Sequence, residues 1–235
     1  MRLFYQPNID AGDTFLDTDE SGHCVKALRL KQGDLIHVAD GKGSIYTCRL
    51  TRPDPGKSFF EIVERKQEPA KTYFIHIAIA PTKNLDRLEW FVEKSVELGI
   101  DKISPILCRT SERKTLRTDR LQRKAISAMK QSLKSRTPEI SEPIPFSDLL
   151  AHHAESEKYI AYLDDLPSPH LINLAKKDGQ YLVLIGPEGD FSSEEVANAT
   201  RLGFQTVSLG NHRLRTETAG IAACHILNLI NEASL

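Results

Sequence analysis

Short runs of alternating apolar and polar residues dominate the first part of the chain. Leu35–Ala39 and Ile45–Leu50 are rich in β-forming residues and flank Asp40-Gly41-Lys42-Gly43, where two glycines can take positive φ. This pattern predicts a β-hairpin. Further strands are predicted at Phe59–Val63, Leu3–Tyr5 and Thr14–Leu16. Because no long helical stripe interrupts these strands, we expect them to bury their apolar faces in a small, partly closed β-barrel.

The pattern changes after a polar stretch at Lys66–Thr72. We therefore predict one domain over residues 1–70 and a second over residues 71–235. In the second part, strands are predicted at Tyr73–Ala80, Ile103–Leu107, Tyr159–Leu163, Tyr181–Ile185 and Thr206–Leu209, and helices at Asn84–Leu98, Asp119–Leu133, Ser193–Leu202 and Thr216–Asn231. This alternation is typical of an α/β domain in which helices cover both faces of a mostly parallel sheet. Ligands of such sheets bind beyond the carboxyl ends of the strands.

Two of the predicted helices have a clear apolar stripe. In the first, Asn84 or Thr82 can cap the start and Gly99 can close the end. One face of this helix carries Leu88, Phe91, Val92, Ser95 and Val96. In the second, the stripe consists of Leu121, Ala125, Ala128, Met129 and Leu133.

Composition narrows the possible classes of protein. The 235 residues are 40% hydrophobic and 27% charged, which is ordinary for a soluble protein, and no apolar run is long enough to span a bilayer. The scattered cysteines and the absence of an apolar signal region favour a cytoplasmic location. No His, Cys and carboxylate spacing suggests a metal site. The net charge of −1 means that any nucleic-acid binding must come from a local patch.

Two loops that follow predicted strands are candidates for ligand binding. The strand Tyr181–Ile185 runs into Gly186-Pro187-Glu188-Gly189, and a helix then begins behind Ser192 or Ser193, with Ser193 as N-cap. This segment suits either a tight strand-to-helix turn or a close backbone approach to a ligand. The polar segment from Asn211 to Thr218 leads into the last helix, which Thr216 can cap. It suits either a capped helix with surface arginines or a ligand site.

Basic residues gather in two places. Arg109–Arg136 carries ten Lys or Arg residues, opposed within the segment by Glu112 and Asp119. The run is either a solvated helix face or a surface for a polyanion, and its single sign favours the polyanion. The β-rich part combines basic and aromatic residues, which suits single-stranded RNA, although the aromatic rings also suit a core. These residues are Arg2, Phe4, Tyr5, His23, Lys26, Arg29 and Lys31.

Taken together and in this order, these segments resemble the RsmE family, the 16S rRNA uridine-N3 methyltransferases of the SPOUT superfamily. The resemblance covers essentially the full length. It rests on MRLFY at the start, H-x-x-x-x-L-R-L-K-x-G-D from His23 to Asp34, K-x-x-x-R-x-x-W-x-x-x-K-x-x-E-L-G from Lys83 to Gly99, LIGPEG from Leu184 to Gly189, and LG-x-x-x-L-R-T-E-T-A from Leu209 to Ala219. The chain departs from the family pattern at Asp190, where a second glycine is common, and at His212 and Arg213, where Arg-Ile is common.

The resemblance implies a fold and partners. It implies a PUA-like β-barrel followed by a SPOUT-type α/β domain with a C-terminal trefoil knot. It also implies S-adenosylmethionine (SAM) as cofactor, 16S rRNA or the small ribosomal subunit as partner, and a homodimer. The implied cofactor-binding residues are Leu163, Ile185, Gly186, Pro187, Glu188, Gly189, Leu209, Gly210 and Leu214. The basic residues expected to contact RNA are Arg2, Arg29, Lys83, Arg109, Arg113, Arg120, Lys124 and Lys134.

Uridine N3 carries a proton and is a poor nucleophile until that proton leaves. On the implied chemistry, Arg215 is the candidate that stabilises the uridine anion, and Glu217 either accepts the proton or orients Arg215. The alternatives are ribose 2′-O-methylation of tRNA or rRNA by another SPOUT enzyme, or a catalytically silent RNA-binding assembly factor. A nucleotide-dependent enzyme is disfavoured, because the chain lacks a phosphate-binding fingerprint.

Overall fold

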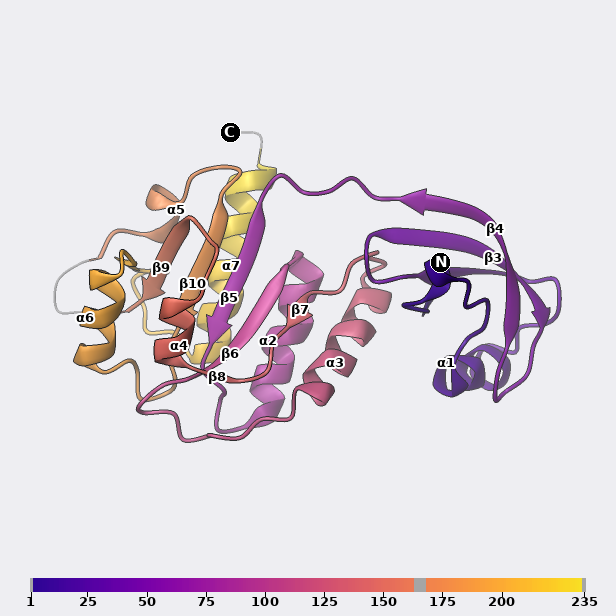
Figure 1. The fold of residues 1–235 in the computed structure, drawn as a ribbon, viewed down its shortest axis with the longest axis horizontal. Helices are drawn as coiled ribbons and strands as arrows, with labels where there is room; N and C mark the ends of the chain where they lie inside the picture. Colours follow the sequence, from indigo (N-terminus) through magenta and orange to yellow (C-terminus); the bar gives the residue numbers. More distant parts are fainter. Residues whose placement is uncertain (1, 163–167, 234–235) are drawn as a thin grey trace. The chain divides into compact units, whose positions relative to one another are not determined.

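The computed structural model describes residues 2–162 and 168–233 (Figure 1). The chain forms two compact units. The first consists of Met1–Ala70 together with Ile126–Thr137, and the second of Lys71–Ala125 together with Pro138–Leu235. A search of the described helices finds none that is both long enough and apolar enough to cross a bilayer.

The first unit is built on a sheet with the strand order β1-β2-β3-β4. The strands are β1 (Leu3–Tyr5), β2 (Leu35–Ala39), β3 (Ser44–Arg52) and β4 (Phe59–Gln67). The predicted hairpin is confirmed, since β2 and β3 pair antiparallel and both Gly41 and Gly43 have positive φ. β1 pairs parallel with β2. The core of this unit includes Phe4, Leu16, Ile36, Val38, Leu50 and Phe60.

The predicted strand at Thr14–Leu16 is reduced to an isolated bridge. Phe15 pairs with Phe59 of β4, and the Leu16 N–H donates to the Ser58 carbonyl at 2.8 Å. The chain therefore reaches the β4 edge soon after β1 has paired at the opposite edge. Between these strands lies a short 3₁₀ turn at Ile9–Ala11.

A helical segment in this unit was not predicted. It consists of α1 (Thr18–Gly22) and a π-helical turn at His23–Ala27. Asp17 caps α1 by accepting a hydrogen bond from the Glu20 N–H at 2.8 Å. An Asp before a Glu three residues later is an N-cap signal that the sequence does contain. The segment is too short to produce a full apolar stripe. Its Cys24 side chain is buried in the core of the unit.

The second unit is an α/β domain whose sheet has the order β11-β9-β10-β5-β6-β7, with β8 paired to β6. Its strands are β5 (Phe74–Ile79), β6 (Lys102–Leu107), β7 (Glu139–Ile140), β8 (Ile144–Pro145), β9 (Glu157–Ala161), β10 (Gln180–Ile185) and β11 (Gln205–Val207). Every pairing among these described strands is parallel, which confirms the predicted sheet type. β11 ends at Val207, two residues before the predicted end of that strand.

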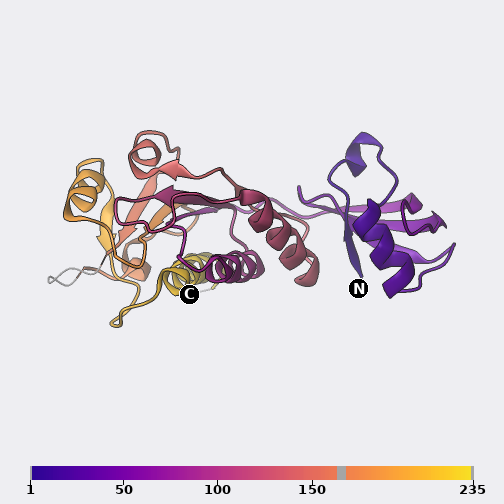
Figure 2. The same cartoon turned by 90° about the horizontal axis from the view of Figure 1, so that it is seen from below.

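Helices cover both faces of this sheet, as predicted. α2 (Leu85–Leu98) and α7 (Thr216–Glu232) lie side by side on one face, and α4 (Phe146–Ala151) lies on the other (Figure 2). α6 (Ser193–Arg201) and α4 contribute to the core on that second face through Phe146, Leu149 and Ala199. A short helix, α5 (Leu171–Leu174), packs near α7. Asn84 caps α2, and Gly99 closes it in a left-handed conformation, as predicted.

The helix α3 (Thr118–Gln131) ends before the predicted boundary at Leu133. Leu121, Ala125, Ala128 and Met129 are buried as expected, but Leu133 is 43% exposed. Leu133 has φ +57, and the N–H of Lys134 bonds back to the Met129 carbonyl. It therefore occupies the left-handed closing position that glycine usually takes, which explains why the apolar periodicity overestimated the helix.

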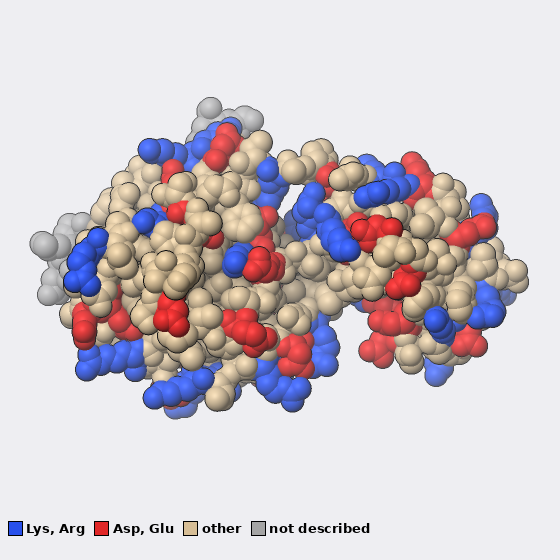
Figure 3. All heavy atoms as spheres, viewed as in Figure 1, with Lys and Arg blue, Asp and Glu red and all other residues tan. Residues whose placement is uncertain are grey.

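The polar face of α3 is largely neutralised by acidic residues from elsewhere in the sequence. Arg120 forms ion pairs with Glu89 and Asp86, and Lys124 pairs with Glu93 at 3.3 Å. All three acids belong to α2. On the face shown in Figure 3, Lys and Arg side chains likewise lie among Asp and Glu side chains instead of forming one continuous basic patch. The charge run in the sequence therefore overstates the positive surface.

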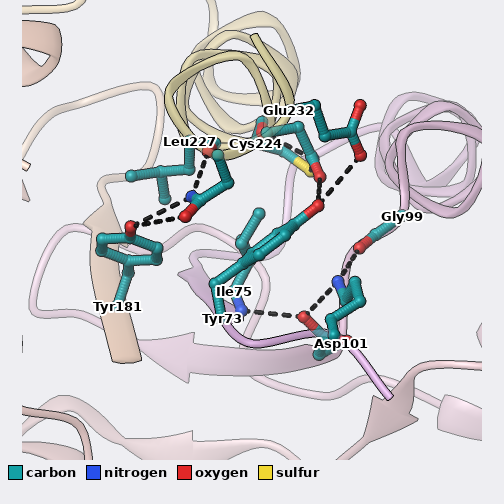
Figure 4. A network of polar contacts seen from close by, with 11 residues as sticks. Tyr73, Ile75, Gly99, Asp101, Tyr181, Cys224, Leu227 and Glu232 are labelled. Carbon is teal, nitrogen blue, oxygen red and sulfur yellow. Dashed lines mark hydrogen bonds and ion pairs between the residues drawn. The ribbon is translucent and has the colours of Figure 1, made fainter. Parts of the chain in front are cut away.

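Two tyrosines at the starts of neighbouring strand segments hold the C-terminal part of α7 (Figure 4). The Tyr73 hydroxyl bonds to Asn228 at 3.0 Å and to Glu232 at 2.9 Å. Burial and the Glu232 carboxylate raise the pKa of Tyr73 well above its ordinary value, so the phenol stays a neutral donor. The Tyr181 hydroxyl accepts a hydrogen bond from Asn231 at 3.0 Å. These contacts fix the helix along the sheet.

Gly220 allows α7 to approach α2 and β5 closely. A Cβ at this position would lie 2.6 Å from Cε2 of Phe91 and 3.1 Å from Cδ1 of Ile79. Alanine normally favours a helix over glycine by about 1 kcal/mol. We nevertheless expect Gly220→Ala to lower the free energy of unfolding by about 1–3 kcal/mol through overpacking. Urea unfolding followed by circular dichroism measures this change.

Gly22, at the end of α1, is the matched control. Its φ is helical, and the nearest atom to an added Cβ is the Pro55 carbonyl oxygen at 3.9 Å. Gly22→Ala should be neutral or stabilising by up to about 1 kcal/mol. Similar stabilisation by both substitutions would contradict the close packing at Gly220.

Candidate functional site

A cavity of about 530 Å³ lies at the carboxyl ends of β9, β10 and β11. Its wall is formed by residues that follow each of these strands and by the first turn of α7. The volume is in the range of cavities that hold small ligands. The position agrees with the rule that ligands of parallel sheets bind where the strands end.

The loop after β10 forms one side of the cavity. A Cβ on Gly186 would lie 3.1 Å from the ring of Phe191, so this turn leaves little room for a side chain. The Asp190 N–H donates to the Pro187 carbonyl at 2.9 Å, which closes the turn. Asp190 has φ +62, a conformation that glycine adopts freely and that Asp tolerates. Its carboxylate accepts from the Phe191 N–H at 2.8 Å, and burial raises its pKa.

The same loop is tied to its surroundings on both sides. The Glu188 carboxylate accepts a hydrogen bond from the Lys83 N–H at 2.9 Å, so it braces the segment before α2. The Thr110 hydroxyl donates to the Asp190 carbonyl at 2.6 Å. At the end of the loop, Ser192 caps α6 in a capping box with Glu195. The expectation of Ser193 as N-cap was therefore wrong by one residue, because Glu195 stands three residues after Ser192.

The segment between β11 and α7 forms the opposite side. Ser208 is held by bonds to Pro169 and Leu171. Gly210 follows with φ +139, and no atom lies within 4 Å of a Cβ built on it. The Thr216 hydroxyl donates to the Gly186 carbonyl at 2.9 Å and joins the two loops. The expectation that Thr216 caps α7 was wrong, since Arg215 occupies the N-cap position without a side-chain cap.

The two predicted catalytic residues have different surroundings. Arg215 is exposed and lines the cavity. Glu217 is 6% exposed, and its Oε1 lies 3.9 Å from Nε of Arg87 on α2. The other oxygen, Oε2, is buried and has no hydrogen-bond partner among the described residues. Glu217 is not part of the cavity wall, although its neighbours Arg215 and Thr216 are.

Most of the predicted cofactor-binding residues line this cavity. Those that do are Ile185, Gly186, Pro187, Glu188, Leu209, Gly210 and Leu214. Gly189 does not line the cavity, and Leu163 lies outside the described residues. The remaining lining residues were not predicted to bind the cofactor; they are Ala161, Tyr162, Asp190, Val207, Ser208, His212, Arg213, Thr216 and Ala219. These residues lie next to predicted site residues in the sequence, and this position is the signal that could have identified them.

The residues expected to contact RNA are spread over both units. Arg2 and Arg29 are exposed in the first unit. In the second, Lys83 pairs with Glu112 at 2.9 Å and Arg109 with Glu194 at 3.1 Å, while Arg113 is bonded to backbone carbonyls. Arg120 and Lys124 pair with α2 as described above. Lys134 is half-buried and has no ion-pair partner in the described part of the chain. A search of the described residues finds no His, Cys, Asp and Glu cluster arranged to hold a metal.

Comparison with known proteins places these features in a family. A family model described as an RNA methyltransferase domain matches residues 68–228, and one described as an RNA methyltransferase PUA domain matches residues 16–63. The chain is 34% identical over 97% of its length to a ribosomal RNA small subunit methyltransferase E of Aquifex aeolicus, 99% of which is covered.

Solved structures agree over the full length. A protein described as a probable rRNA-methyltransferase of Porphyromonas gingivalis is 38% identical, with a TM-score of 0.93 and 99% of each chain covered. A ribosomal RNA small subunit methyltransferase E of Neisseria gonorrhoeae, solved bound to S-adenosyl methionine, is 29% identical, with a TM-score of 0.85 and 98% of each chain covered. On this evidence the chain belongs to the ribosomal RNA small subunit methyltransferase E family, whose N-terminal domain is PUA-like.

Proposed function

We propose that this protein transfers the methyl group of SAM to N3 of a uridine in 16S rRNA of the small ribosomal subunit. The observation that carries the proposal is the cavity where the Gly186–Asp190 loop and the Ser208–Arg215 segment meet. Both loops belong to the motifs of a family in which a relative has been solved with SAM bound. The methyltransferase assignment follows from the family, and the uridine-N3 specificity is the finer part of the proposal.

The chemistry of the cavity wall fits SAM. Ile185, Leu209 and Leu214 supply apolar surface for an adenine ring, and the open side of Gly210 leaves the backbone accessible to a ligand. The backbone of Gly186 to Gly189 would hold the polar parts of the molecule, with Leu163 as a further contact. When bound, SAM supplies an electrophilic methyl group on a positively charged sulfonium.

The protein must lower the barrier to methyl transfer by positioning the uridine and by assisting the removal of its N3 proton. Arg215 stands at the cavity wall, exposed and without an acidic partner among the described residues, so it is available to stabilise a uridine anion electrostatically. Glu217 follows at the start of α7 and has one buried oxygen without a partner. Because its side chain lies outside the cavity wall, it would accept the N3 proton through water or orient Arg215. Because N3 is normally hidden by base pairing, the target uridine must be unpaired or flipped out.

Several finer features of the family are part of the proposal. The split between Ala70 and Lys71 in the compact units supports the proposed boundary between domains at residues 1–70 and 71–235, although Ile126–Thr137 belongs to the first unit. The Phe15 bridge to β4, opposite β1, supports partial closure of the N-terminal sheet into a barrel. A C-terminal trefoil knot is also part of the proposal, supported by the segment that leads from β11 at the sheet edge to α7 packed on β5.

We also propose a homodimer that acts in the cytoplasm, where the small ribosomal subunit is its substrate. Apolar side chains of α7 that are not buried against the sheet, such as Leu229 with 43% exposure, are available for a subunit contact. RNA would be contacted by Arg2, Arg29, Lys83, Arg109, Arg113, Arg120, Lys124 and Lys134. Those residues that form ion pairs in the free protein must either break these pairs when RNA binds or contact the RNA while they remain paired.

The test of the function is methyl transfer from labelled SAM to unmodified small ribosomal subunits, followed by nucleoside mass spectrometry. We expect 3-methyluridine. A ribose-methylated nucleoside would show a different acceptor atom. SAM binding without transfer to any ribosomal RNA would indicate an RNA-binding assembly factor.

Arg215→Ala should lower methyl transfer by about two orders of magnitude or more, the usual effect of removing a charge-stabilising donor. SAM affinity, measured by calorimetry, should change little. Arg213→Ala is the matched control, because Arg213 lines the same cavity two residues away. Retained activity in Arg215→Ala, or an equal loss in both variants, would remove Arg215 from the mechanism.

Glu217→Gln keeps the shape of the side chain and removes its negative charge. We expect methyl transfer to fall by about 10²–10⁴-fold, the range for a general base, while SAM still binds. The control is Glu194→Gln, which also removes an acid from the first turn of a helix but at a side chain with 74% exposure. Transfer rates within about threefold of wild type for Glu217→Gln would be incompatible with proton transfer by Glu217.

A further inference from the structure

A second cavity, of about 470 Å³, lies beside the start of α2 and the first turns of α3. We call it the arginine cavity. Its described lining consists of Leu85, Arg113, Thr115, Leu116, Arg117, Asp119, Arg120 and Arg123. Within this lining, four guanidinium groups face one carboxylate. None of the cofactor-binding positions belongs to the lining of this cavity.

The arginines are held in place by contacts that use only some of their N–H donors. Arg117 and Arg123 share Asp119, with Nη2 to Oδ2 distances of 3.1 and 3.0 Å. The hydrogen bond from Arg117 keeps the pKa of Asp119 below its ordinary value, so this carboxylate stays charged. Arg120 is matched by Asp86 and Glu89 of α2. The four arginines of the lining therefore exceed the carboxylates of Asp86, Glu89 and Asp119 by one positive charge, and Arg113 bonds only to backbone carbonyls.

We propose that the arginine cavity binds phosphate groups of the substrate RNA next to the target nucleotide. This inference rests on the function proposed above. The planar guanidinium fork matches two phosphate oxygens, and arginine carries more donors than its present partners use. Leu85 and Leu116 add apolar surface to the same wall, which suits the sugar or base attached to a bound phosphate.

The backbone of Thr82 and Lys83 connects the arginine cavity to the cavity assigned to SAM. The Lys83 N–H donates to Glu188, which lines the SAM cavity. The Lys83 carbonyl accepts a hydrogen bond from Nη2 of Arg113 at 2.8 Å, and Nε of Arg113 donates to the Thr82 carbonyl at 3.2 Å. RNA held at the arginine cavity is thus held beside the segment that braces the SAM loop. The placement makes the site suitable for positioning the strand that carries the uridine.

The test removes two of the arginines and measures RNA binding. Arg117 and Arg123 have side chains 86% and 73% exposed, so their replacement leaves the core intact. The variant Arg117→Ala/Arg123→Ala is compared with wild type for binding of unmodified small-subunit rRNA, transcribed in vitro, over a series of salt concentrations. Affinity should fall about tenfold or more, and the slope of log K against log salt should become shallower by about 1.4, or about 0.7 per lost phosphate contact. SAM affinity should not change.

The matched control is Lys177→Ala/Arg201→Ala, which removes the same two positive charges from exposed positions that line neither cavity. It should change the affinity by no more than about twofold. Equal losses in the two double variants, or an unchanged salt slope in the arginine variant, overturn the proposal, as does a wild type that binds no RNA.

Methyl transfer separates this proposal from the function on which it rests. A selective loss of RNA affinity without 3-methyluridine in the wild-type reaction supports the phosphate site and overturns the methylation specificity. Formation of 3-methyluridine by the wild type together with unchanged RNA binding by the arginine variant supports the methylation specificity and overturns the phosphate site. A loss of binding in the arginine variant accompanied by a higher KM for RNA supports both.

Discussion

The close packing of α7 on α2 and β5 is the constraint on which the site depends. Gly220 lets the two helices approach, and the tyrosine contacts of Asn228 and Asn231 set the position of α7 along the sheet. The first turn of α7 then delivers Arg215, Thr216 and Glu217 to the edge where the strands end. Because the Thr216 hydroxyl bonds to Gly186, a small shift of the helix would also move the loop after β10. The packing of the core therefore determines the geometry of the site in this domain.

The positions of the two site loops could be predicted because they depend on local and topological rules. Parallel strands place their carboxyl ends at one edge of the sheet, so the motif after Ile185 and the segment after Val207 lie on the same edge. The sequence pattern does not reveal which strands are neighbours. β9 lies between β10 and β11, and this order brings Ala161 and Tyr162, at the end of β9, into the wall although no motif marks them.

Charge pairing shows a different limit of prediction from sequence. The run Arg109–Arg136 contains two acidic residues, so its pattern predicts a strongly basic surface. In the folded chain, α2 supplies Glu89 and Glu93 to α3, and α6 supplies Glu194 to Arg109. Such partners are remote in sequence and appear only once the helices are placed. What remains is a smaller excess of positive charge. Arg117 and Arg123 share one carboxylate, and Arg113, Lys114, Lys134 and Arg136 have no acidic partner in the described part of the chain.

Glu217, like Glu20 in the first unit, is a buried carboxylate with one oxygen that has no hydrogen-bond partner among the described residues. An unsatisfied buried polar atom costs about 1–3 kcal/mol, and more when the group is charged. The Arg87 guanidinium at 3.9 Å offsets part of this cost for Oε1 but does not bond to Oε2. A glutamine could fill the same volume without the charge, and an apolar residue could fill it without either cost. Retaining a carboxylate here makes sense if its free oxygen receives a proton or a donor during the reaction, beside an arginine that stabilises the charge left on the base.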